Sequence, residues 1–474
     1  MNDVANDVDD SLGELLALQR TAFLREGPPS LTQRRADLKK LRTAIVARKT
    51  DITDAMMADF GHRAPFESLM EPLSLALGID YLLGNLAKFM RPTRRHVAMS
   101  MRFGSARIEY QPLGVIGIVS PWNYPFALAM MPLVTAIAAG NRVMIKPSEL
   151  TPASADFLVS FLADLFPKEQ VAVVTGDASV GAAFSALPFD HLIFTGSTAV
   201  GRSVMKAASE NLVPVTLELG GKNPAIVEKG SSLQRAAEGI AYGKLQNGGQ
   251  ICISPDYAMV HEDDVAQFVD AYSQAVAAFY PDGSTGTDYT SIINEKHYAR
   301  LTGLLDDARA KGARVVSVGR DRENAPTRAH TLPPSVVLDT TDDMTIMREE
   351  IFGPILPILP YRKVEEAISY INARPRPLAL YYFGTRNGGD CRTVLSRTTS
   401  GNVTINNTLM HYVQDDLPFG GVGASGMGSY HGLEGFRTFS HAKGVFDQKK
   451  WNAGNLLRPP FGGLANFVMK MMLR

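Results

Sequence analysis

This chain has few cysteines and no net charge. Its 474 residues include two cysteines, and its 48 basic residues are balanced by 48 acidic ones. Two cysteines cannot build a disulfide framework for a chain of this length, which favours a reducing, cytoplasmic compartment. A balanced charge without a basic arm excludes the general electrostatic attraction on which nucleic-acid partners depend. The acidic start, MNDVANDVDD, also lacks the pattern of a secretory signal.

Apolar segments that could span a membrane are missing as well. Residues 110–141 carry no charge, but prolines and glycines interrupt them and would leave backbone groups unpaired in lipid. The apolar tail LANFVMKMMLR has about half of the ~20 residues that a span needs. We therefore expect no integral membrane span. The tail is expected to pack on a partner subunit or over a substrate entrance, with loose membrane contact as the alternative.

The apolar pattern predicts an α/β fold. Three- and four-residue spacing indicates helices within 11–90, and 105–119 reads as strand, turn and strand. Apolar strands then alternate with helices, of which 151–166 is the clearest, with Thr151 as its expected cap. Uniformly apolar strands of this kind are typical of parallel sheets covered on both faces. A second α/β series starts near 221, so we expect two α/β domains and a smaller appended region.

Cys252 is the first candidate for chemistry, in QNGGQICISP. Two glycines shortly before it allow close approach of a ligand. No Lys, Arg or His lies within five residues to lower the pKa of its thiol, so a buried, inert cysteine is the competing interpretation. Cys391, in GGDCRTVLSR, is interpreted as structural.

Two polar residues sit where a buried site could use them. Glu218 ends an apolar strand before Gly-Gly, and burial there would raise the pKa of its carboxyl to a value useful for a general base. Asn123, in SPWNYPFA, is an amide within the uncharged stretch and could donate to a developing oxyanion. The alternative for Glu218 is a surface carboxylate, and the alternative for Asn123 is an amide that stabilises its loop.

Two strand ends resemble nucleotide-binding elements. In FTGSTAVG (194–201) a strand runs through Gly196 and Ser197 into a helix, a turn that can hold phosphate. It is not the GxGxxG fingerprint. In VMIKPSE, Lys146 could bind ribose or phosphate, and Glu149 would favour a free 2′-hydroxyl over a 2′-phosphate. A surface ion pair is the alternative for this pair.

The order of these segments is more specific than any one of them. SPWNYP, KPSE, FTGSTAVG, ELGGKNP, GGQIC, EEIFGP and LPFGG appear in one sequence, with Glu218 and Cys252 34 positions apart. In this order and spacing, from about 110 to 445, the chain resembles the aldehyde dehydrogenase family. The resemblance implies a Rossmann-like NAD(P)-binding domain (1–98 and 113–219), an α/β catalytic domain (220–405), and a bridging or oligomerisation region with the C-terminal tail (99–112 and 406–474).

The resemblance also assigns roles. It implies Cys252 as nucleophile, Glu218 as general base, and Asn123 with the Cys252 backbone N–H as oxyanion hole. The cofactor, NAD with NADP as a possibility, would contact the following residues: Trp122, Lys146, Ser148, Glu149, Gly176, Gly196, Ser197, Val200, Glu350 and Phe352. No metal is implied. Glu218 favours hydrolysis to a free acid over transfer to coenzyme A. A cysteine hydrolase using the same pair is the alternative from another class, as is a catalytically silent relative.

The branch of the family suggests the substrate. PWNYP, CISPDY and the segment NNTLMHYVQDDLPFGGVGASGMG resemble the class 3-like branch, which includes coniferyl aldehyde and fatty aldehyde enzymes. The coniferyl type is the nearer resemblance, which predicts an aromatic aldehyde, with a long-chain aliphatic aldehyde as the alternative. A homodimer is expected. Tyr124, Phe126, His411 and Tyr412 are candidates for the substrate tunnel, although core packing would explain them equally well.

Overall fold

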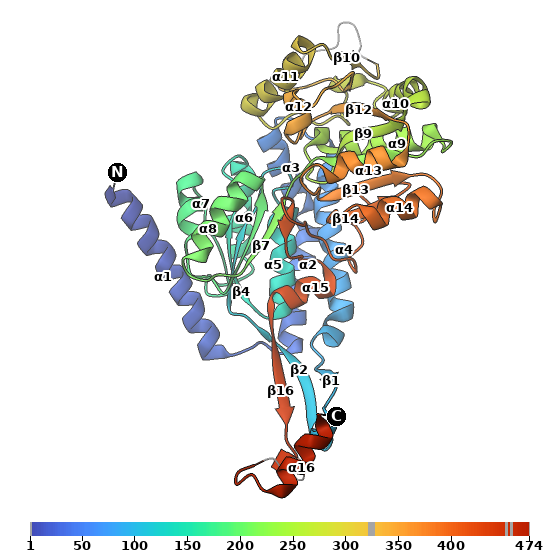
Figure 1. Ribbon diagram of the computed structural model, residues 1–474. Helices are drawn as coiled ribbons and strands as arrows, with labels where there is room; N and C mark the ends of the chain where they lie inside the picture. The colour runs from blue at the N-terminus through green and yellow to red at the C-terminus, as the bar shows by residue number, and fades with distance from the viewer. Residues whose placement is uncertain (1, 321–327, 451–453, 456–457, 474) are drawn as a thin grey trace.

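The fold consists of three sheets, with helices around the two larger ones (Figure 1). The computed structural model describes residues 2–320, 328–450, 454–455 and 458–473. The helices expected within 11–90 are present as α1 (Asn2–Glu26), α2 (Leu31–Ala47), α3 (Lys49–Phe60) and α4 (Pro65–Phe89). The predicted class, two α/β units and a smaller region, is confirmed.

A six-stranded sheet is built mainly from residues 115–219, in the order β15-β7-β6-β3-β4-β5. Its strands are β3 (Val115–Val119), β4 (Arg142–Lys146), β5 (Val171–Val173), β6 (His191–Gly196), β7 (Val215–Leu219) and β15 (Gly426–Met427). All pairs are parallel except β15 with β7. Its crossover helices are α5 (Ala127–Ala139), α6 (Pro152–Ala163), α7 (Ala178–Ser185) and α8 (Thr198–Ser209). α1, α7 and α8 contact one face, and α5, backed by α2 and α4, contacts the other.

A seven-stranded sheet follows, in the order β10-β11-β12-β9-β8-β13-β14. Its strands are β8 (Asn223–Val227), β9 (Pro255–His261), β10 (Arg314–Ser317), β11 (Ser335–Leu338), β12 (Ile355–Tyr361), β13 (Ala379–Phe383) and β14 (Asn402–Ile405). Only β10 pairs antiparallel. Its helices are α9 (Leu233–Leu245), α10 (Val265–Phe279), α11 (Glu295–Ala310), α12 (Thr345–Arg348), α13 (Val364–Asn372) and α14 (Gly389–Arg397).

The third sheet projects from the lower end of the molecule as drawn in Figure 1. It joins β1 (Thr93–Arg95), β2 (Ser105–Pro112) and β16 (Ser440–Asp447), all antiparallel. Residues 105–119 are therefore strand, turn and strand as predicted, but β2 and β3 lie in different sheets. α15 (Gly432–Thr438) precedes β16, and α16 (Gly463–Met472) ends the chain beside this sheet (Figure 1). Within the described part of the chain, no helix combines the length and apolar character needed to cross a membrane.

The start of α6 shows how tertiary contacts replace a local cap. Thr151 precedes the helix as predicted, but its side chain makes no capping hydrogen bond. Instead the Asp59 carboxylate of α3 accepts the backbone N–H groups of Ala153 and Ser154, both at 2.9 Å. The expected cap was therefore wrong, because a carboxylate from 94 positions earlier satisfies the unpaired donors of the first turn.

Candidate active site

The candidate residues of the first sheet lie at its carboxyl edge. The register pairs Val119 with Lys146, and Thr195 with Glu218, so the loops after β3, β4, β6 and β7 leave the sheet at one edge. Those loops carry Asn123, Ser148 and Ser197 respectively, and Glu218 lies at the end of β7. Parallel strands place ligand-binding loops at this edge of a sheet. The topology therefore brings residues that are far apart in sequence around one cleft.

Cys252 follows a turn of unusual backbone conformation. α9 ends at Leu245, and Asn247, Gly248 and Gly249 all adopt positive φ angles of 51°, 61° and 76°. Asparagine and glycine tolerate this region better than other residues. Beyond the turn the carbonyl of Cys252 accepts a 2.8 Å hydrogen bond from Asn223 Nδ2. The nucleophile candidate is thus fixed on both sides, and its own side chain is half-buried.

Asn123 lies directly against the turn that precedes Cys252. The side chain is buried, and its Nδ2 donates to the carbonyl of Gln250 at 3.0 Å. The Asn247 side chain donates in return to the carbonyl of Asn123 at 3.0 Å. A side-chain amide has two N–H groups. One N–H of Asn123 therefore anchors the amide to the nucleophile turn, and the second is available to a ligand.

Two cavities meet at Cys252. The first is largely apolar, holds about 720 Å³ including its open mouth, and is lined by Tyr124, Tyr242 and Tyr412 among others. The second is lined by Trp122, Asn123, Gly196, Ser197, Glu218, His297, Arg300, Glu350 and Phe352. Cys252 lines both cavities. A ligand in each would meet at the thiol, so the structure offers a two-ligand site with one shared nucleophile.

Burial dominates the electrostatics of the thiol. It raises the pKa of Cys252 to about 12, and the negative charges of Glu350 and Glu218 add to that rise. The backbone N–H groups of Cys252 and Ile253 act in the opposite direction. Desolvation and nearby like charge both disfavour a thiolate. The thiol is therefore protonated at neutral pH in the ligand-free enzyme.

Glu218 and Glu350 are also displaced toward their neutral forms. Burial raises the pKa of Glu218 well above its usual value, and its two carboxyl oxygens have no hydrogen-bond partner among the described residues. The enclosed position of Glu350 raises its pKa to about 8, with a further rise from the charge of Asp256. A buried carboxyl with free oxygens has the properties of a general base awaiting water or substrate.

The nucleotide-binding candidates lie in and beside the second cavity. The Trp122 ring packs edge-on against Phe352, with centroids 5.4 Å apart, and contacts His297. Ser197 caps α8 by accepting the N–H of Val200, and Val200 itself is exposed. Helix N-termini of this kind favour phosphate. Glu350 borders both the second cavity and a larger cleft along Thr198, Arg202 and Gly221, so the space continues beyond the thiol.

The remaining nucleotide candidates surround the end of β4. Buried Lys146 donates to the carbonyl of Pro147 at 2.9 Å and lies 3.4 Å from the Glu149 carboxylate, which is exposed. The Ser148 hydroxyl accepts the N–H of Leu150. Gly176 has a φ of +143°, and a Cβ there would lie 2.6 Å from Val180. Glu149 is therefore paired with Lys146 but exposed, so ligand hydroxyls can reach its carboxylate.

The aromatic candidates divide into two groups. Tyr124 and Tyr412 line the first cavity, whereas His411 and Phe126 do not. Buried His411 shares a 2.8 Å hydrogen bond with Thr404 and stacks on Phe419. Phe126 packs against aromatic rings of α6. The structure therefore places His411 and Phe126 in the core, behind the cavity wall.

Several polar residues that contact the site were not singled out from the sequence. Asn223 bridges the carbonyls of Cys252 and Ser254, and Gln250 connects the nucleophile turn to Ser291 and Ile293. His297 and Arg300 line the second cavity from α11. The sequence offered two signals, the amide of Asn223 within GGKNP and the amide of Gln250 within GGQIC. A buried amide needs hydrogen-bond partners, so both could have been expected to brace the site. The α11 residues gave no signal in the sequence.

The high pKa of Cys252 makes a measurable prediction. The rate of alkylation by iodoacetamide in the cofactor-free enzyme should rise with pH from about 7 to 10 without a plateau, because the thiolate is the reacting form and only a small fraction is present below a pKa of about 12. Mass spectrometry of the modified protein would follow the reaction. A plateau near neutral pH would show that the thiol is activated without ligand, contrary to this expectation.

Comparison with known proteins shows the family of this chain. The aldehyde dehydrogenase family model matches residues 18–445. A Pseudomonas aeruginosa protein named "Probable coniferyl aldehyde dehydrogenase" is 50% identical over 98% of this chain and 97% of its own length. Mouse aldehyde dehydrogenase family 3 member A2 is 40% identical over 90% of this chain and 86% of its own. The chain therefore belongs to the aldehyde dehydrogenase family.

Solved structures support the same assignment. The substrate-bound Staphylococcus aureus AldH has a TM-score of 0.90 and 36% identity, covering 97% of this chain and 99% of that one. PnpE in complex with nicotinamide adenine dinucleotide has a TM-score of 0.83 and 26% identity, covering 92% and 90%. The predicted enzyme class, an oxidoreductase of the aldehyde dehydrogenase family, is confirmed, and so is the likeness to coniferyl and class 3 enzymes.

Proposed function

We propose that the enzyme oxidises an aldehyde to its carboxylic acid with NAD as cofactor, through a covalent intermediate on Cys252. One observation carries the proposal: the apolar cavity and the cavity that holds Asn123, Glu218 and Glu350 meet at the Cys252 thiol. An aldehyde entering by the first cavity and a nicotinamide entering by the second would face each other across the sulfur.

The first half-reaction uses Cys252 and Asn123. The thiol proton passes to solvent as sulfur attacks the aldehyde carbon and the carbonyl oxygen becomes an oxyanion. The free N–H of Asn123 and the backbone N–H of Cys252 are the expected donors to that oxyanion. When bound, the cofactor supplies the acceptor for the hydride that leaves the former aldehyde carbon.

The residues around the second cavity suit such a cofactor. The Glu350 carboxyl has an oxygen without a partner among the described residues, in a place where a ribose hydroxyl could bind. Gly196, Ser197 and Val200 at the start of α8 would hold the pyrophosphate, and Glu350 and Phe352 the nicotinamide ribose and ring. The adenosine and ribose pocket would be formed by Trp122, Lys146, Ser148 and Glu149, with Gly176 as a further cofactor contact. The exposed Glu149 carboxylate favours NAD over NADP, although NADP is not excluded by it.

The second half-reaction releases the acid. Water attacks the thioester on Cys252 and passes its proton to Glu218. The C–S bond breaks, and sulfur leaves as a thiolate that Glu218 can then reprotonate. The two free oxygens of Glu218 support this role over acyl transfer to coenzyme A. A cysteine hydrolase would use the same pair, but it would have no use for the cleft that continues past Glu350 along Thr198 and Arg202.

We propose an aromatic substrate of the coniferyl type. The first cavity is apolar and carries the rings of Tyr124, Tyr242 and Tyr412, which can pack against a planar aldehyde. Relatives named coniferyl aldehyde dehydrogenase are 43–50% identical to this chain. A long-chain aliphatic aldehyde is the alternative, since an apolar cavity also accepts alkyl chains.

A panel of aldehydes tests the activity and the substrate class together. Reduced-nicotinamide absorbance should appear with NAD, and kcat/KM should be at least about tenfold higher for coniferyl-type aldehydes than for long-chain aliphatic ones. A preference of that size for the aliphatic aldehydes would replace the aromatic proposal. No absorbance with any aldehyde, together with thioester or amide hydrolysis, would favour the hydrolase.

The division into domains is part of the proposal. Residues 1–98 and 113–219 would bind the cofactor, 220–405 would form the catalytic domain, and 99–112 with 406–474 would serve bridging and oligomerisation. The projecting three-stranded sheet and exposed Phe103, Phe446 and Phe467 support a homodimer, which light scattering would test. The scarcity of cysteine supports a cytoplasmic location, which imaging of a tagged protein would test.

A further inference from the structure

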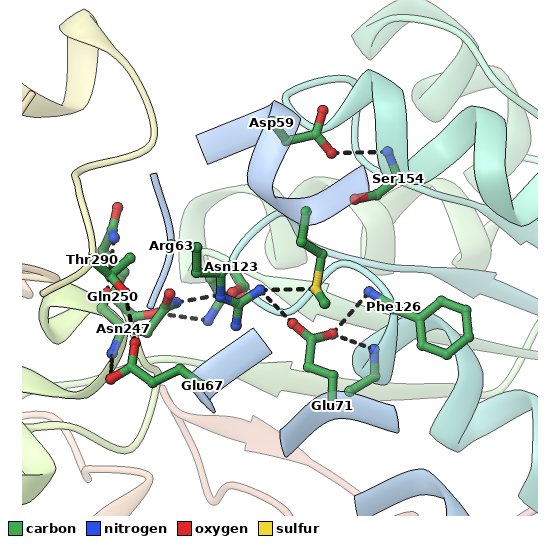
Figure 2. A network of polar contacts seen from close by, with 12 residues as sticks. Asp59, Arg63, Glu67, Glu71, Asn123, Phe126, Ser154, Asn247, Gln250 and Thr290 are labelled. Atoms are coloured by element: carbon green, nitrogen blue, oxygen red, sulfur yellow. Dashed lines mark hydrogen bonds and ion pairs between the residues drawn. The ribbon is translucent and has the colours of Figure 1, made fainter. Parts of the chain in front are cut away.

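Two carboxylates of α4, one helical turn apart, face the two loops that form the site. Glu67 contacts the turn before Cys252, and Glu71 contacts the start of α5 just after Asn123. Arg63 lies between them, as Figure 2 shows. No role in the reaction has been assigned above to any of these three residues.

Glu71 fixes the loop that carries Asn123. Its Oε2 accepts the backbone N–H groups of Phe126 at 3.1 Å and Ala127 at 2.7 Å, and its Oε1 accepts from Arg63 Nη1 at 2.5 Å. Arg63 and Glu71 are both fully buried. Breaking such a pair by removing one partner leaves a buried charge and is strongly destabilising. The pair is therefore poorly suited to a test of function, because its variants would unfold.

Glu67 makes a different set of contacts. Its Oε1 accepts the backbone N–H of Asn247 at 2.9 Å, and its Oε2 accepts the hydroxyl of Thr290 at 2.6 Å. The same hydroxyl oxygen of Thr290 accepts the N–H of Ala64 at 3.0 Å. Burial raises the pKa of Glu67. Keeping its carboxylate charged, the form that accepts these hydrogen bonds best, therefore costs free energy. Among the described residues, Glu67 forms no ion pair.

The residue that Glu67 holds begins the turn of positive φ. Asn247 is the one residue of that turn that is not glycine, and its side chain reaches back to the carbonyl of Asn123. A positive φ costs free energy for a residue with a side chain and persists only where the surroundings enforce it. A hydrogen bond from a backbone N–H to a carboxylate is among the stronger ones available to enforce it.

We propose that Glu67 is a positioning residue for the oxidation of aldehydes: its carboxylate holds the turn at Asn247 and thereby sets the distance between the Cys252 thiol and the Asn123 amide. This inference rests on the proposed function of those two residues. Displacing reacting groups by about 1 Å costs on the order of a hundredfold in rate. Glu67 itself is not among the residues that line the two cavities.

The test compares Glu67→Gln, Thr290→Val and Thr290→Ser. Glutamine offers the Asn247 N–H a neutral acceptor in place of a carboxylate, and valine removes the Thr290 hydroxyl, so both should lower kcat with the aldehyde by about tenfold to a hundredfold. KM for the aldehyde should change by about twofold or less, because the cavity wall is untouched. Iodoacetamide should modify Cys252 at a changed rate in both variants. Thr290→Ser retains the hydroxyl and should restore the wild-type values.

Asp59→Asn is the matched control. Asp59 also presents a carboxylate to two backbone N–H groups, but at the start of α6 (Figure 2). Its amide variant should lower the unfolding temperature and leave the alkylation rate of Cys252 unchanged. If Glu67→Gln behaved like Asp59→Asn, or Thr290→Val kept the wild-type kcat, the positioning role would be wrong. If Glu67→Gln failed to fold, the Thr290 pair would decide.

The outcome is separable from that of the proposed function. A wild-type enzyme that reduces no cofactor with any aldehyde would overturn the function, and with it the inference. A wild-type enzyme that is active, with variants of unchanged kcat and alkylation rate, would overturn the inference alone.

Discussion

Replacing Cys252 with serine should lower kcat for aldehyde oxidation by a factor on the order of 10³ or more. The hydroxyl is a far weaker nucleophile than the thiol, and among the described residues no cation acts on position 252 to activate it. NAD should still bind, because serine is close to cysteine in size and the other residues of the second cavity are unchanged. Reduced-nicotinamide absorbance would give the rate, and quenching of intrinsic fluorescence would give the binding of NAD.

Cys391→Ala provides the matched control for this variant. Cys391 is the other cysteine of the chain, and it is buried in α14 away from both cavities. The alanine variant should keep the wild-type kcat and remain open to alkylation at Cys252, whereas Cys252→Ser should resist alkylation. Aldehyde turnover by Cys252→Ser at more than about a tenth of the wild-type rate would exclude the covalent mechanism.

Glu218→Gln should separate the two half-reactions. Glutamine cannot accept the proton of water, so the steady-state kcat should fall by about 10² to 10⁴. The thioester should then accumulate, and rapid mixing should show a burst of reduced cofactor near one equivalent per active site, because thioester formation does not use Glu218. Intact-mass measurement after an acid quench should find the acyl group on the protein.

The pH dependence of stability distinguishes the loss of kcat in Glu218→Gln from unfolding of the variant. The pKa of Glu218 is raised in the folded protein, so its stabilising contribution is greatest at low pH and is lost as pH rises through the folded-state pKa. Glu218→Gln should therefore be at least as stable as the wild type near pH 7, where burial of the Glu218 carboxyl lowers the free energy of unfolding of the wild type.

In the wild type, kcat should rise with pH as Glu218 loses its proton. A variant with unchanged steady-state kcat would show that another group activates the water.

Much of the site could be anticipated from local sequence, and the reason is physical. Glu218 ends an apolar strand before two glycines, and Asn123 lies in an uncharged loop. Both patterns are typical of a polar group that lies in a cleft at a strand end, is shielded from water and requires hydrogen-bond partners. Cys252 was different, because its neighbours in sequence gave no sign of reactivity. Its place where two cavities meet supplies the argument that local sequence could not.

Other features depended on contacts between distant segments. Thr151 was expected to cap α6, but the carboxylate of Asp59 does so. His411 looked suited to a substrate tunnel, but it lies behind the wall that Tyr412 forms. In neither case could the local sequence decide, because the outcome depends on how segments distant in the chain pack together.

The sequence by itself determined the alternation of strands and helices, and hence the parallel sheets, because apolar periodicity acts over a few residues. It also determined which residue types stand at the strand ends. Only the tertiary structure decided that β2 leaves β3 to join β16, and that α4 braces the turn at Asn247 from 180 positions away. Those contacts join surfaces far apart in the chain, and complementary shape and hydrogen bonding select them only once the elements have packed.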